Sequence, residues 1–336
     1  MKLWQKEGAI SEEPSNAGSR SAAEKIERFT VGRDRELDAL LAQHDITGTL
    51  AHITMLEHIG LLEAAELTTL TQALRQLYQE VLQGNCEIQP GVEDVHSQVE
   101  LMLTERLGTV GKKIHSGRSR NDQVLGDLKL FTRTELRRVV ELIRPLFDRL
   151  IALSNEHAHL TLPGYTHYQV AMPSSYGLSF GAYAESLVDD LQVLLGAFKI
   201  TNKNPLGSAA GYGSSFPLNR TMTTELLGFD DLNYNVVYAQ MGRGKTERVV
   251  AQALSSVAAT LSKLAQDICL YNSQNFNFVR FPDHLTTGSS IMPHKKNPDV
   301  FELIRAKCNK IMALPVEIAL ITRNLSSGYH RDLQII

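Results

Sequence analysis

Three long segments of the chain carry an apolar residue at every third or fourth position, which is the spacing of one face of an α-helix. The first contains Pro145, which lacks an amide hydrogen and is expected to kink its helix. The second covers about residues 174–200, and the third covers about residues 246–275 without Gly or Pro. The apolar positions are Leu136, Val139, Ile143, Leu146, Leu150 and Leu153 in the first; Ala184, Leu187, Leu191, Leu194 and Phe198 in the second; and Val250, Leu254, Val257, Leu261, Leu264 and Ile268 in the third.

These stripes predict an all-α fold built on a bundle of long helices. A helix of about thirty residues is about 45 Å long, so it needs partners along its whole length. Because one chain supplies few such segments, we expect the bundle to be an oligomeric core.

The rest of the chain predicts shorter elements. A helical pattern covers residues 34–85, a short helix covers residues 92–107, and a polar loop covers residues 108–122. We therefore expect three parts. They are an N-terminal arm at residues 1–25, a mostly helical domain at residues 26–122, and a central long-helix domain at residues 123–336.

Residues 205–217 join the second and third long segments and are rich in Gly, Ala and Ser. Small residues of this kind let the backbone approach another group closely. A tight crossover between helices and a loop against a substrate fit this composition equally well.

Composition narrows the function. Of the 336 residues 43% are apolar and 21% charged, as in ordinary globular proteins, and the formal net charge is −3. That charge gives no general attraction to nucleic acid or to a membrane, so any anion site has to be local. The sequence shows neither a secretory signal nor a membrane-spanning run. Since Cys86, Cys269 and Cys308 are far apart and without metal-binding spacing, we expect a cytoplasmic protein with reduced thiols.

The most unusual polar stretch is residues 288–299, which read Gly-Ser-Ser-Ile-Met-Pro-His-Lys-Lys-Asn-Pro-Asp. A Lys-Lys pair alone favours a solvated basic loop, but hydroxyl groups beside it favour an anion site. Pro298 suits the first position of a following helix, with Asn297 as its N-cap. Because helix N-termini attract anions, Lys295 and Asn297 would then face a bound anion.

Three further polar clusters, at residues 93–96, 115–123 and 163–169, fall at the ends of expected helices. The second cluster offers guanidinium, hydroxyl and amide donors that suit a carboxylate, although a solvated loop paired with its own Asp122 fits equally well. In the third, His167 is a candidate acid or base, while a lone loop histidine is more often structural.

Two other kinds of site fit poorly. Residues 239–246 resemble a P-loop, but Ala239 stands where the first glycine is needed and the strand expected before it, residues 236–238, is thin. His157 and His159 lack the spacing of a zinc site. We expect neither a metal nor a cofactor.

Five stretches of the chain carry a resemblance to a known family. Residues 288–298 resemble the Gly-Ser-Ser-x-Met-Pro-x-Lys-x-Asn-Pro motif of the fumarase/aspartase superfamily. Residues 115–123 are similar to the His-x-Gly-Arg-Ser-Arg-Asn-Asp-Gln motif of its argininosuccinate lyases, and residues 163–169 to their Pro-Gly-Tyr-Thr-His-x-Gln motif. Residues 93–97 and 45–52 are also similar, so the resemblance covers nearly the whole chain.

The resemblance implies the reversible anti elimination of argininosuccinate to arginine and fumarate, a step of arginine biosynthesis. The proton that leaves lies beside a carboxylate, so the intermediate carries two negative charges there and needs cations and hydrogen-bond donors. By position Ser289 is the base, His167 supplies or positions the acid, and Glu302 pairs with the histidine. The implied catalytic residues are Ser289, His167, Lys295 and Glu302, and the implied substrate-binding residues are His96, Ser119, Arg120, Asn121, Thr166, Arg243, Asn297, Tyr329 and Gln334.

Within that set, Tyr329 and Gln334 would hold the arginine end of the substrate. The resemblance also implies a homotetramer in which three chains build each site.

The chain departs from the family pattern in two main ways. Residues 241–244 read Met-Gly-Arg-Gly where many members have Ser-Asp-Arg-Asp, and relatives continue as a further helical domain, so the chain is expected to be truncated.

Two alternatives stay open at this point. One is a silent structural protein like the lens crystallins, or an inactive truncated homologue; the presence of Ser289, Lys295 and His167 argues against lost chemistry. The other is a sister lyase that acts on a different succinyl adduct, such as adenylosuccinate. The Gly-Arg-Ser-Arg-Asn-Asp-Gln run at residues 117–123 argues against it.

Overall fold

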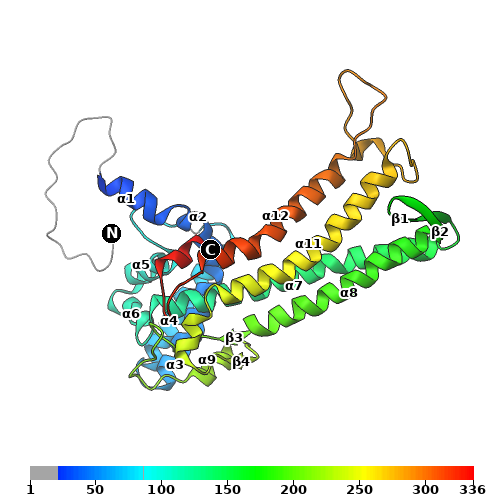
Figure 1. Cartoon of the computed structure of the whole chain (residues 1–336). Helices are drawn as coiled ribbons and strands as arrows, with labels where there is room; N and C mark the ends of the chain where they lie inside the picture. The colour runs from blue at the N-terminus through cyan, green and yellow to red at the C-terminus, as the bar shows by residue number, and fades with distance from the viewer. Residues whose placement is uncertain (1–21, 86) are drawn as a thin grey trace, which may run out of the picture. The chain divides into compact units, whose positions relative to one another are not determined.

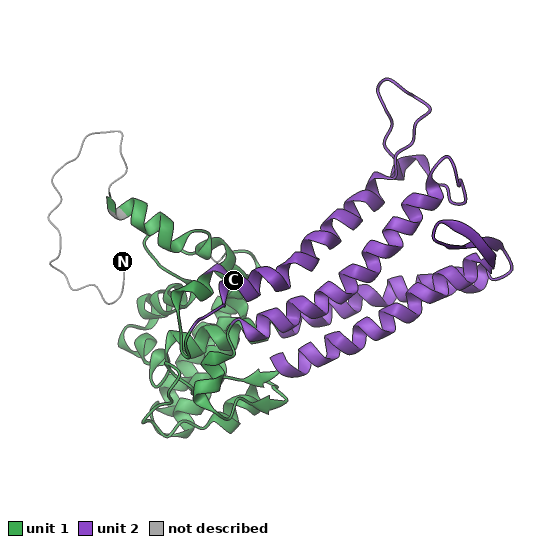
Figure 2. Cartoon of the chain, viewed as in Figure 1, with its two compact units in different colours: residues 1–132, 202–243, 326–334 green, residues 133–201, 244–325, 335–336 purple. Residues whose placement is uncertain are grey.

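The computed structural model describes residues 22–85 and 87–336, so Cys86 and most of the expected N-terminal arm lie outside the described residues. The chain divides into two compact units (Figure 2). Unit 1 comprises residues 1–132, 202–243 and 326–334, and unit 2 comprises residues 133–201, 244–325 and 335–336.

Unit 1 is a cluster of short and medium helices (Figure 1). Its largest core lies between α3 and α4, where Leu70, Leu74 and Leu77 of α4 follow helical spacing and are buried with Ile53 and Leu56 of α3. The elements are α1 Ala22–Val31, α2 Asp34–Asp38, η1 Ala39–Leu41, α3 Ala42–His58, α4 Ala64–Leu82, α5 Val95–Leu107, α6 Thr109–Lys112, η2 Lys113–His115, the start of α7 Arg120–Glu156, β3 Lys203–Asn204, α9 Arg220–Leu226, β4 Asp231–Leu232, α10 Val236–Met241 and η4 Arg331–Ile335.

Residues 202–243 belong to unit 1 because of contacts that are remote in sequence. The parallel pair β3–β4 closes this segment on itself. Leu206, Leu227 and Phe229 form a second small core with Ala51 and Leu130. The first boundary between the units lies between residues 132 and 133, whereas the sequence pattern placed it between residues 122 and 123. Packing between distant segments leaves no local pattern in the sequence.

Unit 2 contains the long helices (Figures 1 and 2). Its core combines the three apolar stripes of α7, α8 and α11, including Ile143, Leu187 and Val257, so the predicted all-α bundle is confirmed. Helix α7 continues through Pro145, and no described helix has the length and apolarity to span a membrane. The elements are the rest of α7, β1 Thr161–Thr166, β2 Gln169–Ser175, α8 Tyr176–Thr201, α11 Lys245–Asn272, η3 Asp283–Leu285 and α12 Asp299–Ile321.

Three local expectations need correction. Residues 161–175, for which no strand was expected, form an antiparallel hairpin. Residues 236–238 are the first turn of α10. The side chain of Asn235 forms the N-cap of this helix, because it accepts hydrogen bonds from the amides of Val237 and Tyr238. Helix α12 begins at Asp299 with Pro298 as its N-cap residue, one position later than expected.

Candidate functional site

The candidate residues are divided between the two units. Unit 1 holds His96, Ser119, Arg120, Asn121, Arg243, Tyr329 and Gln334, whereas unit 2 holds Thr166, His167, Ser289, Lys295, Asn297 and Glu302.

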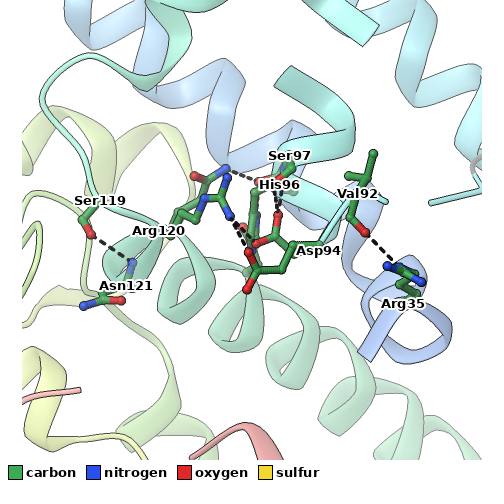
Figure 3. A network of polar contacts seen from close by, with 12 residues as sticks. Arg35, Val92, Asp94, His96, Ser97, Ser119, Arg120 and Asn121 are labelled. Carbon is green, nitrogen blue, oxygen red and sulfur yellow. Dashed lines mark hydrogen bonds and ion pairs between the residues drawn. The ribbon is translucent and has the colours of Figure 1, made fainter. Parts of the chain in front are cut away.

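In unit 1 the Ser119–Asn121 turn starts the long helix α7 (Figure 3). The amide of Asn121 donates to Ser119 Oγ at 3.2 Å, and the amide of Ser119 donates to Asp122 Oδ1 at 2.9 Å. Ser119, Arg120 and Asn121 are all partly exposed. Since the N-terminus of a helix carries a partial positive charge, this turn suits an anionic ligand.

Arg120 is paired with acidic side chains of unit 1. Its guanidinium lies 2.8 Å from Asp94 Oδ2 (Figure 3). It also lies 3.8 Å from Glu93 Oε2. Asp94 also caps α5 by accepting a hydrogen bond from the amide of Ser97 at 2.7 Å. Cluster 93–96 is thereby joined to the Ser119–Asn121 turn by an ion pair.

His96 is buried in unit 1, where it contacts two acidic side chains. It is 5% exposed, and its Nδ1 lies 2.8 Å from Asp45 Oδ1 and 3.3 Å from Asp127 Oδ2. Burial alone would lower the pKa of His96, but the charge and hydrogen bond of Asp45, together with the charge of Asp127, raise that pKa to about 9. A neutral-pH imidazolium therefore bridges two carboxyl groups.

The same three residues are a cluster whose ligand atoms could surround a cation. Two observations favour an internal ion network instead. The protonated His96 already supplies the positive charge, and Arg118, itself buried, adds a second one and donates to Thr49 Oγ1 at 3.0 Å. Burial, with the charge of Asp45, also holds the pKa of Asp127 well above its ordinary range, so this carboxyl group binds a proton readily.

The last described segment of unit 1 places Tyr329 and Gln334. Tyr329 is 37% exposed and Gln334 is exposed. Arg243 donates from Nη2 to the carbonyl of Leu333 at 3.1 Å, and Arg331 lies 3.6 Å from Glu93. Arg243 thus braces the segment that carries the two candidate residues for the arginine end.

Gly244 explains one departure from the family motif. It has a φ of +75°, and a Cβ at this position would lie 2.3 Å from Thr322 Cγ2 of the same unit. A residue with a side chain would meet both backbone strain and a clash. The glycine after Arg243 is therefore required by the packing of α11 against the end of α12.

In unit 2, Thr166 and His167 lie at the tip of the hairpin. Thr166 pairs with Gln169, which leaves a two-residue turn of His167 and Tyr168 with φ values of +53° and +58°. Such a left-handed turn matches the twist of the two strands. Both candidate side chains are exposed there.

The loop with the superfamily motif is closed at its base and open at its end. Thr287 and Asn297 form a bridge, in which the amide of Asn297 donates to the carbonyl of Thr287 at 2.9 Å. The hydroxyl of Thr287 donates to Asp299 at the start of α12. Within the loop that this bridge closes, Lys295 is exposed and Ser289 is partly exposed, and Asn297 of the bridge is partly exposed.

Ser289 lies inside a tight turn of this loop. Its Oγ accepts hydrogen bonds from the amides of Ile291 at 3.3 Å and Met292 at 3.2 Å. Hydrogen bonds to an oxygen favour its negatively charged form. The turn therefore offers the donors that a serine acting as a base requires.

Glu302 is exposed in the first turn of α12. In the described part of the chain no hydrogen bond or ion pair joins it to His167.

The sequence pattern did not single out Asp45 or Asp127. Asp45 lies in the stretch 45–52 that resembles the family, but nothing in the local pattern shows that it faces His96.

Comparison with known proteins gives one consistent family. A model of the lyase family matches residues 25–313. The argininosuccinate lyase of Bacteroides fragilis is 66% identical over 100% of this chain, which covers 72% of that protein, and the argininosuccinate lyase of Xanthomonas oryzae pv. oryzae is 41% identical over 99% of this chain and 74% of that protein. Among solved structures, an EDDS lyase in complex with formate has a TM-score of 0.80 and 26% identity, over 94% of this chain and 64% of that chain.

Proposed function

This chain belongs to the argininosuccinate lyase family, and we propose that it catalyses the reversible elimination of argininosuccinate to arginine and fumarate. The observation that carries the proposal is the 66% identity to an argininosuccinate lyase over the whole chain. A silent structural protein or a lyase for another succinyl adduct is not favoured, because relatives at both 66% and 41% identity bear the same name.

The first step is proton removal from the succinyl carbon next to a carboxylate. Ser289 is the proposed base, and the amides of Ile291 and Met292 that donate to its Oγ support this role. They stabilise the alkoxide form, whose charge would otherwise be costly in a closed site. The proton passes to Ser289 Oγ, and the electron pair of the C–H bond moves onto the substrate carboxylate.

The second requirement is stabilisation of the dianion that this step creates. Lys295 supplies a positive charge, and Asn297, Asn121 and Thr166 supply hydrogen-bond donors. Ser119 and Arg120 lie on the same turn as Asn121, at the positive end of α7. We assign these three turn residues to the fumarate part of the substrate.

In the third step the electron pair returns from the carboxylate to form the C=C bond of fumarate, the C–N bond breaks, and its electron pair leaves with the nitrogen of arginine. Because the guanidinium group of arginine keeps its proton at all ordinary pH values, the departing nitrogen has to gain a proton. We assign this proton to His167, with Glu302 from another chain as the partner that orients it. Tyr329 and Gln334, braced by Arg243, would hold the arginine end. These steps use only proton transfer and electrostatic stabilisation by side chains.

The assembly we propose is a homotetramer in which three chains build each site. Helix α8 supports an extensive interface, since large apolar side chains of this helix are exposed in the single chain. They are Leu178, Val188, Val193, Leu195 and Ile200. We further propose that the enzyme acts in the cytoplasm.

The test is a direct assay of fumarate formation from argininosuccinate, followed by ultraviolet absorbance. Ser289→Ala should reduce turnover by about 10²-fold or more, the usual contribution of a positioned acid or base. The matched control is Ser290→Ala, because the neighbouring hydroxyl is exposed and lies in the same loop. No turnover by the unmodified protein, or equal loss in both variants, would refute the assignment.

A further inference from the structure

Asp122 is a buried carboxylate with an unusual set of partners. It is fully buried, at 0% exposure. Its Oδ1 accepts from the amide of Ser119 at 2.9 Å, and its Oδ2 accepts from the amides of Gly207 and Ala209, both also at 2.9 Å. All three donors are backbone groups, and two of them come from a segment about which the sequence left two interpretations open.

That segment, Pro205–Gly213, has a backbone shape that depends on small residues. Gly207 has a φ of +83° and Ala209 has a φ of +50°. A Cβ at Gly207 would lie 2.7 Å from Arg220 Cγ, and a Cβ at Gly211 would lie 2.7 Å from Gln240 Cγ. The backbone is thus pressed against its surroundings, and the carboxylate of Asp122 holds two of its amides.

The same loop also reaches the segment proposed for the arginine end. A Cβ at Gly328 would lie 3.7 Å from the hydroxyl oxygen of Tyr212, so Tyr212 extends to the residue just before Tyr329. Gln240 donates to the carbonyl of Ala209 at 3.4 Å. Within unit 1 the loop therefore touches the Ser119 turn at one end and the Tyr329 segment at the other, which a simple crossover between helices does not require.

We propose that Asp122 is a positioning residue whose carboxylate fixes the loop Pro205–Gly213 to the Ser119–Asn121 turn, so that loop and turn form one wall of the substrate site. The wall receives the fumarate part of the substrate at the turn, and this part of the inference rests on the proposed function. Asp122 itself does not touch the substrate. It acts by setting the position of Ser119 and of the loop backbone.

The first experiment compares Asp122→Asn with the unmodified protein. An amide NH2 group cannot accept a hydrogen bond, so the variant loses at least one of the three bonds. Hydrogen exchange followed by mass spectrometry should then become faster in peptides covering residues 205–213. The matched control is Asp190→Asn, another buried carboxylate, which accepts from Ser256 and Thr260 in unit 2. It should lower thermal stability without changing exchange at residues 205–213.

The second experiment measures inhibition by each product. In Asp122→Asn the inhibition constant of fumarate should rise about tenfold, because the displaced Ser119–Asn121 turn loses one hydrogen bond to a carboxylate of fumarate. The inhibition constant of arginine should change much less. If Asp122→Asn does not assemble, Asp122→Glu takes its place, because it keeps the charge and displaces the carboxylate by one methylene.

Three outcomes overturn parts of this inference in distinguishable ways. Unchanged exchange at residues 205–213 refutes the fixing of the loop. Equal weakening of fumarate and arginine refutes the placement of the wall. If the unmodified protein does not turn over argininosuccinate, the proposed function fails, and the exchange result still decides whether Asp122 holds the loop.

Discussion

Replacement of His96 by Gln tests the buried ion network of unit 1. The ring lies between Asp45 and Asp127, with Nδ1 to carboxylate distances of 2.8 and 3.3 Å. These charges raise the pKa of His96 to about 9 from an ordinary value of 6.5, against the opposing effect of burial. Glutamine has a similar length and can keep one hydrogen bond, but it carries no charge.

The size of the effect follows from the difference between the two pKa values. At about 1.4 kcal/mol for each pH unit, the difference corresponds to about 3 kcal/mol of folding free energy. Because the pKa is raised in the folded state, this stabilisation is fully present below pH 6.5 and is lost as the pH rises through about 9. Against a typical total of about 5–15 kcal/mol, that is a large share.

The assay is urea unfolding followed by far-ultraviolet circular dichroism at several pH values between those limits, at one protein concentration. Asp127 also has a raised pKa and weakens the folded state in the same direction as the pH rises. The difference in unfolding free energy between the unmodified protein and His96→Gln reports the charge of the histidine together with its effect on Asp45 and Asp127. We expect that difference to shrink by about 3 kcal/mol across the window.

A control keeps the comparison specific to the buried ring. His58→Gln changes an exposed histidine at the end of α3 and should leave the pH dependence as it is. A difference between His96→Gln and the unmodified protein that stays constant from about pH 6.5 to about pH 9 would refute the reasoning. So would a carbon chemical shift of the His96 ring that titrates near its ordinary pKa.

Three further predictions are simpler. Gly244→Ala should lower the unfolding free energy by about 2–4 kcal/mol, from left-handed strain plus a clash with α12. Gly228→Ala, with a φ of +60° and open space around it, should show the strain alone, and equal losses in urea melts would contradict this. Lys295→Met should lower the turnover number by about 10²-fold or more, whereas Lys296→Met should change it little; steady-state kinetics on both decides. Asp190→Ala should lower the unfolding free energy by about 1–3 kcal/mol, because Ser256 and Thr260 each lose the hydrogen bond that they donate to Asp190, and calorimetry can measure this loss.

The long helices could be predicted from the sequence because their cause is local. An apolar stripe at steps of three and four fixes which side of a helix is buried, whatever that side packs against. The stripes of α7, α8 and α11 accordingly meet in one core. The motif at residues 288–298 was equally visible, since prolines, hydroxyls and cations within one short loop have no role in a core.

The hairpin at residues 161–175 and the helix at Val236–Met241 were not predicted. In the first, a two-residue turn of His167 and Tyr168 lacks the usual glycine or asparagine. In the second, β-branched and aromatic residues favour a strand by propensity, but the cap of Asn235 overrides them. Both cases depend on one local interaction that is stronger than the average preference.

By itself, then, the sequence determined the helical bundle, the family and the residues that carry the proposed chemistry. Only the tertiary structure decided which residues from distant parts of the chain lie in contact. Asp122 meets Gly207 across 85 positions, and His96 meets Asp45 across 51. Such pairs leave no periodic trace, because they are set by how distant segments pack. That packing places His96 behind the Ser119–Asn121 turn and makes Asp122 the link between this turn and the loop beside it.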